Sequence, residues 1–219
     1  MLQEIINNTN EFIGENLFSI LTLIIASIAL LQTHKQIKIS NKQNLFNKRV
    51  DNFLIIDGLI KLYEENKNLI EIKENNVFLE VTTLFMGLTN NTYLKDIGTI
   101  IKEVENEEIR QKFLIKLEEM KKLSLEHQLL FNGNNIKYIE KFVIEYQNLL
   151  RALYKYQALL DKILKANKKE PKSFEEWQKL YREDVERKEV FDSYAKIQNL
   201  YNDIKNKNVI RDVKSQIKL

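Results

Sequence analysis

Residues 16–33, NLFSILTLIIASIALLQT, decide the fold of this chain because they contain no charged side chain and are almost continuously apolar. A helix rises about 1.5 Å per residue, so this segment reaches about 27 Å, close to the ~30 Å hydrocarbon core of a bilayer. We therefore expect residues 16–33 to form a transmembrane helix. Because the rest of the chain carries a helical period, the predicted fold class is all-α, with one N-terminal transmembrane helix followed by a cytoplasmic helical bundle.

The charges that flank this segment predict its orientation. Three glutamates and no Lys or Arg precede it within residues 1–15. The basic residues that follow it are Lys35, Lys38, Lys42, Lys48 and Arg49. Since cationic loops stay on the cytoplasmic side, we expect residues 1–15 outside the cell membrane and residues from 34 onward inside. The same five basic side chains are candidates for contact with anionic lipid headgroups, at about 1 kcal/mol each.

Two other interpretations of the apolar segment remain open. One is a buried core helix of a soluble protein, because eighteen uncharged residues lie at the lower end of spanning length. The other is a cleaved signal peptide. That interpretation is disfavoured because the residues before the segment are acidic instead of basic, and because no convincing small-residue cleavage site is present.

The composition excludes several kinds of chemistry. The chain contains no Cys, which removes disulfides, thiolate metal sites and a Cys nucleophile. Its two histidines, His34 and His127, have no second His at ligand spacing, and there is no phosphate-binding Gly-rich loop. We therefore predict no catalytic residue, no metal and no cofactor, and we expect the protein not to be an enzyme. The basic excess is small and diffuse, so nucleic-acid binding is not expected.

The helical period and its breaks predict the domain organisation. After the segment 1–15 and the transmembrane helix 16–33, we expect a basic juxtamembrane helix in residues 34–76, with a kink permitted at Gly58, and a helical bundle in residues 77–219. A capping box is expected at Ser173 and Glu176, and a frayed end is expected after Asn206. The segments expected within the bundle are Val77–Leu88, Tyr93–Val104, Glu107–Phe131, Ile136–Ala166 and Ser173–Asn206.

One face of the apolar segment carries only small or polar side chains at intervals of three and four residues. This seam consists of Ser19, Thr22, Ala26, Ala29, Thr33 and Gln36. An average interval of 3.5 residues keeps one helix face against a neighbour, and small residues let helices approach closely. We therefore expect a homo-oligomer, with the seam either packed between helices or facing a pore. The alternative is that the seam packs on another partner or faces lipid.

The order of a single span (Leu17–Leu31), a basic juxtamembrane helix (His34–Arg49) and a helical cytoplasmic domain resembles the small membrane effectors of bacterial anti-phage systems. It is similar in layout to the membrane accessory protein of type VI CRISPR systems. That resemblance implies a bacterial cell membrane, an oligomeric pore and a HEPN-like cytoplasmic domain. HEPN ribonucleases carry an Arg shortly before a His, but Met120, Lys121 and Lys122 stand at those distances before His127. The resemblance therefore implies an inactive scaffold, and a membrane-anchored adaptor for a protein partner remains the second hypothesis.

Overall fold

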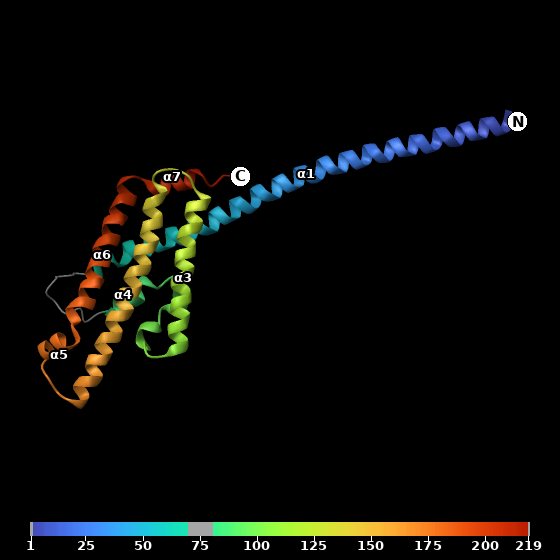
Figure 1. Ribbon diagram of the computed structural model, residues 1–219. Coiled ribbons are helices and arrows are strands. Elements are labelled where there is room, and N and C mark those ends of the chain that lie inside the picture. The colour runs from blue at the N-terminus through green and yellow to red at the C-terminus, as the bar shows by residue number, and fades with distance from the viewer. Residues whose placement is uncertain (1, 70–80, 219) are drawn as a thin grey trace. The chain divides into compact units, whose positions relative to one another are not determined.

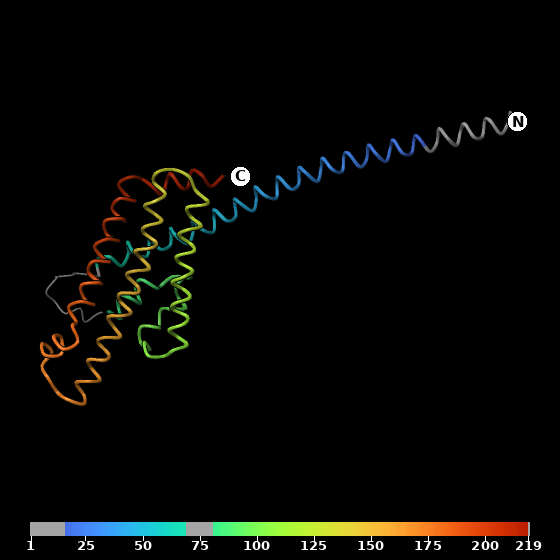
Figure 2. The backbone as a smooth tube through the Cα atoms, viewed as in Figure 1, coloured from blue at the N-terminus to red at the C-terminus, as the bar shows by residue number. Residues whose placement is uncertain are grey.

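The computed structural model describes residues 2–69 and 81–218, with side chains from residue 16 onward (Figure 2). Within these ranges every regular element is a helix, which confirms the predicted all-α class for the described residues. The α-helices are α1 (Leu2–Asn66), α2 (Val81–Leu88), α3 (Glu107–Leu130), α4 (Ile136–Lys169), α5 (Phe174–Tyr181), α6 (Glu183–Asn206) and α7 (Val209–Ser215). Three single-turn 3₁₀ helices are η1 (Lys67–Leu69), η2 (Lys95–Ile97) and η3 (Ile100–Lys102).

The chain divides into two compact units, one ending at Asn47 and the other comprising Lys48–Lys218. Helix α1 contributes residues to both. In the first unit it contains one segment that is long and apolar enough to cross a bilayer, and none of that segment is buried by the described residues. This exposure argues against the interpretation of residues 16–33 as a core helix of this chain.

The second unit is a helical bundle built around α4. Helices α3 and α6 both pack along α4, and Figure 1 shows the three side by side, with α5 and α7 at opposite ends of the bundle. The long α4 supplies much of the core because its apolar residues recur at helical spacing. Its fully buried members include Ile139, Phe142, Val143, Tyr146, Leu149, Leu150 and Leu153. Toward the C-terminal end of α4, Ile163 is buried, whereas Leu164 is 60% exposed.

The C-terminal half of α1 belongs to the bundle. Phe53, Ile56, Leu59 and Tyr63 are buried in the common core, whereas Leu54 is 60% exposed. Gly58 does not interrupt the helix, since α1 continues as one α-helix to Asn66. A Cβ at Gly58 would meet no atom within 4 Å, so this glycine is not required by close packing. Expectations for residues 70–80, including the end of the juxtamembrane helix, lie outside the described residues.

The segment expected as one helix from Ser173 to Asn206 is two helices. The predicted capping box is present at the start of α5, where Ser173 and Glu176 exchange side-chain and backbone hydrogen bonds. Arg182 then adopts a left-handed conformation with φ 52° and ψ 45°, which ends α5 and redirects the chain into α6. No glycine marks this break, so the helical period alone could not reveal it.

Two further segments correct the sequence predictions. Tyr93–Val104, expected as a short helix, contains only η2 and η3, whose Ile97, Ile100 and Ile101 nevertheless enter the core. The chain after Asn206 is not frayed, because α7 buries Val209 and Val213 completely. These two residues, four apart on one helix face, hold α7 against the bundle.

Candidate functional site

Three of the four hydroxyl groups of the apolar segment donate to backbone carbonyl groups of α1 itself. Thr22 Oγ1 donates to Phe18 O, Ser27 Oγ to Leu23 O and Thr33 Oγ1 to Ala29 O, each at 2.8 Å. Such bonds to the carbonyl four residues earlier let a hydroxyl group lie in an apolar medium without losing a hydrogen bond. The polar members of the seam are therefore compatible with lipid or with a packed helix interface, and they do not require a water-filled path.

Three of the four lysines that follow the apolar segment lie on the opposite side of α1 from the seam. Lys35, Lys38 and Lys42 are exposed and follow one another at intervals of three and four residues. At 3.6 residues per turn, the mean direction of these three lysines lies about 170° around the helix axis from the mean direction of the seam residues between Ser19 and Thr33. Two helices joined through the seam would therefore point these lysines away from each other. The exposed Lys48 lies off this face.

Arg49 differs from the four lysines because the bundle uses its guanidinium group. Its Nε donates to Leu130 O at 2.9 Å and its Nη1 to Gln216 O at 3.1 Å. The guanidinium also lies over the ring of Phe131, 5.9 Å from the centroid. It thereby caps carbonyl groups at the C-terminal ends of α3 and α7, where cations are favoured. We accordingly restrict the predicted lipid contact to Lys35, Lys38, Lys42 and Lys48.

One turn further along α1, Asn52 forms a buried polar pair with His127 of α3. The Asn52 amide group donates through Nδ2 to Leu123 O at 3.1 Å, so its Oδ1 accepts from His127 Nδ1, 2.8 Å away. Asn52 is 3% exposed and His127 is fully buried, with the Phe131 ring 4.6 Å from the imidazole. We call Arg49, Asn52 and His127 the polar anchor, because they attach α1 to the bundle through directional bonds.

The polar anchor fixes the protonation of His127. Since Nδ1 carries the donated proton, the neutral tautomer leaves Nε2 as a bare acceptor, and that atom is buried with no hydrogen-bond partner among the described residues. Burial lowers the pKa of His127 from 6.5 to about 4, because the charged imidazolium would be desolvated.

This depressed pKa predicts a stability that depends on pH. In the unfolded chain His127 takes up a proton near pH 6.5, whereas in the bundle it stays neutral down to about pH 4. The unfolded state therefore binds more protons in this window, so stability is full above pH 6.5 and falls as the pH drops toward 4, by up to about 3 kcal/mol. Urea unfolding at several pH values measures this loss. The double variant Asn52→Leu/His127→Leu should lose this part of the pH dependence, and an unchanged pH profile would contradict the assignment.

The described residues contain no candidate metal site, but they include two buried polar side chains that were not predicted from the sequence. Among the described residues, no group of three or more His, Asp or Glu side chains could hold a metal ion. Asn52 was not predicted as a site residue, although it continues the apolar stripe of Ile56, Leu59 and Tyr63 at intervals of four and three. Glu183 was not predicted either; it is completely buried and stands seven residues before the core residue Val190. A polar residue at a core position of a helical period was the available signal in both cases.

Comparison with known proteins identifies no relative from which a function could be inferred. No protein-family model, no curated protein and no solved structure matches this chain. The features of this chain that bear on its function are therefore the exposed apolar segment of α1, its seam and lysine face, and the polar anchor.

Proposed function

We propose that this protein is a single-pass membrane protein that acts as an oligomeric effector, with its N-terminus outside a bacterial cell and its bundle in the cytoplasm. One observation carries the proposal. A single uninterrupted helix contains both an uncharged, fully exposed segment of spanning length and residues buried in the bundle core. An apolar surface of that size is stable in lipid, whereas in water it promotes aggregation. The layout shared with small anti-phage effectors suggests a role in defence.

The arrangement of side chains around α1 supports self-association. The seam offers small residues for close helix contact, and the lysine face opposite to it keeps positive charge away from such a contact. Lys35, Lys38 and Lys42 then lie where anionic headgroups would attract them. Because the Thr22 and Thr33 hydroxyl groups already donate to the backbone, a packed seam is better supported than a water-filled pore.

Leucine substitutions in the seam test self-association. Ser19→Leu/Thr22→Leu adds bulk where helices would approach closely, so we expect the native mass of the full-length protein in mild detergent, corrected for bound detergent, to fall from an oligomer to a monomer. Ser27→Leu is the matched control. It removes a hydroxyl group with the same type of bond, to Leu23 O, but lies off the seam, so the oligomer should persist. A monomeric wild-type protein, or an oligomer unaffected by the double substitution, would contradict the proposal.

A membrane-anchored adaptor is the second candidate, and one surface feature favours it. Helix α3 exposes several large apolar side chains on the outside of the bundle, among them Leu125 and Leu129, the latter 85% exposed. Exposed apolar groups of this kind are typical of protein contacts. An adaptor should keep its activity when residues 16–33 are replaced by an unrelated spanning helix, whereas an effector that assembles through the seam should lose it.

A further inference from the structure

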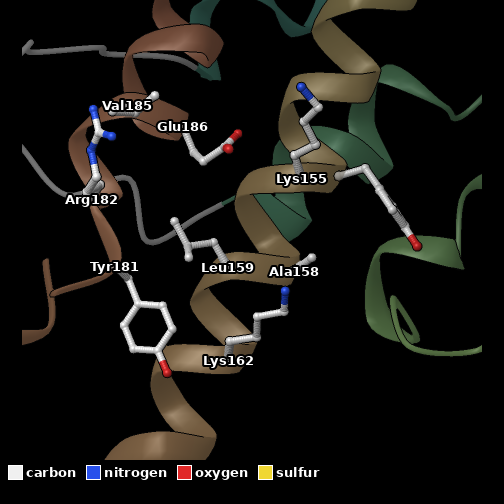
Figure 3. Close-up of a pocket in the computed structure, with 9 residues that line it drawn as sticks. Lys155, Ala158, Leu159, Lys162, Tyr181, Arg182, Val185 and Glu186 are labelled. Carbon is white, nitrogen blue, oxygen red and sulfur yellow. The ribbon is translucent and has the colours of Figure 1, made fainter.

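The hollow between α4 and the junction of α5 with α6 does not define a ligand site (Figure 3). It holds about 550 Å³ but is open, and its charged groups do not converge. Figure 3 shows Lys162 lying along α4 and the Arg182 side chain pointing away from it, at the margin of the hollow. A ligand site needs polar groups that are placed to meet on one molecule. The exposed apolar side chains of the bundle follow a more definite pattern.

The outer face of α3 carries a regular series of exposed residues. They follow one another at alternating intervals of four and three residues, and we call them the outer stripe: Gln111, Ile115, Glu118, Lys122, Leu125 and Leu129. At 3.6 residues per turn, the mean direction of the outer stripe lies about 170° around the helix axis from that of the buried residues of α3. The described residues of the bundle therefore leave this face of α3 uncovered.

The outer stripe is apolar toward both ends and charged in the middle. Ile115 precedes the charges and Leu125 follows them, and both are large, exposed apolar side chains. Glu118 and Lys122 form the centre. Glu118 makes no ion pair with any described residue, and Lys122 Nζ lies 3.8 Å from Glu126 Oε1, at the long end of the ion-pair range. Both central charges are therefore accessible to a partner, and the alternation of four and three suits contact with a second helix.

The order of these residues makes the outer stripe complementary to itself when it is reversed. In an antiparallel pair of α3 helices centred at Met120, residues equally far from Met120 face each other. Ile115 then meets Leu125, each five residues from the centre, and Glu118 meets Lys122, each two residues from it. Two-fold symmetry forms this ion pair twice. A parallel pair in register would instead set Glu118 against Glu118 and Lys122 against Lys122, which like-charge repulsion disfavours.

We propose that the outer stripe binds the outer stripe of a second copy of this chain, with the two α3 helices antiparallel and centred at Met120. A closed contact of this kind uses the same patch on both copies. The central Glu118 and Lys122 fix the orientation of the pair, at some cost in affinity. This contact lies in the bundle and goes beyond the association through the seam of α1.

The direction of α1 inside the bundle is compatible with this pairing. Asn52 of α1 is hydrogen-bonded to Leu123 O and to His127 of α3, and Figure 1 shows α1 crossing α3 there at a steep angle. The two-fold axis that reverses α3 is perpendicular to α3, and directions along that axis are unchanged in the second copy. Residues 48–66 of α1 can therefore run in the same direction in both copies, as two chains anchored in one membrane require.

Paired cysteine variants test the register, because the native chain contains no Cys. Full-length Ile115→Cys and Leu125→Cys, carrying different tags, are expressed together or separately and oxidised in cell membranes. We expect disulfide dimers that contain both tags, and almost none from either variant alone, because two copies of residue 115 lie about 15 Å apart along the paired helices. Lys112→Cys with Gln128→Cys is the matched control. These residues are also equally far from Met120, but they lie on opposite flanks of the stripe and should not cross-link.

Charge reversal in the same cysteine background tests the central ion pair. Glu118→Lys or Lys122→Glu alone should lower the yield of mixed dimers at least about tenfold, because like charges then meet at the centre. The double variant Glu118→Lys/Lys122→Glu should restore the yield, since the attraction is then only reversed. Lys188→Glu, exposed on α6, is the control, and circular dichroism confirms that each variant is folded.

Three results would overturn the proposal. Dimers of each cysteine variant with itself would indicate a parallel pair. Absence of mixed dimers would assign the outer stripe to another protein, and failure of the double charge reversal to restore them would exclude the ion pair. These measurements read contacts of α3 alone, so they are independent of the outcome of the seam substitutions.

Discussion

Replacing Ile24 and Ile25 with arginine is expected to move this protein from the membrane fraction to the soluble fraction while its bundle stays folded. Both residues lie at the centre of the uncharged segment and are at least half exposed. An arginine at the middle of a spanning helix costs about 3 kcal/mol on insertion scales, so the pair costs about 6 kcal/mol. Flotation of cell membranes and resistance to alkaline carbonate extraction measure the effect.

The control for this experiment is Ile24→Leu/Ile25→Leu, which keeps the segment apolar and should leave insertion unchanged. Circular dichroism of the soluble arginine variant should show the helix content of the bundle, since the core residues of Lys48–Lys218 are untouched. Carbonate-resistant membrane association of the arginine variant would mean that residues 16–33 do not span the bilayer.

Asn52→Leu is expected to destabilise the bundle by about 3 kcal/mol, although it replaces a buried polar side chain with an apolar one of similar size. The substitution removes two hydrogen bonds and leaves the Nδ1–H of His127 buried without an acceptor. An unsatisfied buried donor costs about 1–3 kcal/mol in addition to the lost bonds. Urea unfolding of the full-length protein in nanodiscs, followed by Trp177 fluorescence, measures the difference.

A double-mutant cycle separates this pair from a general packing effect. Asn52→Leu/His127→Leu removes both polar partners, so much of the stability should return, with a coupling free energy of about 2 kcal/mol. Asn66→Leu is the matched control on the same helix. Among the described residues its side chain donates to Leu62 O, one turn earlier, and we expect a loss below about 1 kcal/mol. Additive effects of the two leucine substitutions would contradict the polar anchor.

The sequence predicted the parts of the fold that follow from periodicity. An apolar residue every three or four positions located α3 and α4 to within a few residues, and Ser173 with Glu176 placed the start of α5. The break at Arg182 was not predictable in this way, because an arginine gives no signal for a left-handed residue. The order of α7 was also missed, since Val209 and Val213 are a short pair in a Lys-rich segment and gain their stability from the bundle.

The candidate site was predictable where it depends on one helix and not where it depends on several. The apolar segment, its seam and its lysine face are properties of consecutive residues of α1. The role of Arg49 needed the structure, because its acceptors, Leu130 O and Gln216 O, are far away in sequence. The pairing of Asn52 with His127 likewise joins residues 75 positions apart.

Cysteine accessibility tests most directly whether α1 crosses the membrane and leaves the bundle on the lysine side. The native chain contains no Cys, so Asn10→Cys and Ser40→Cys each introduce a single site on either side of residues 16–33. With a membrane-impermeant maleimide on spheroplasts, we expect labelling of Asn10→Cys before permeabilisation and of Ser40→Cys only after it. Protection of both sites until permeabilisation, or labelling of Ser40→Cys before it, would contradict this orientation.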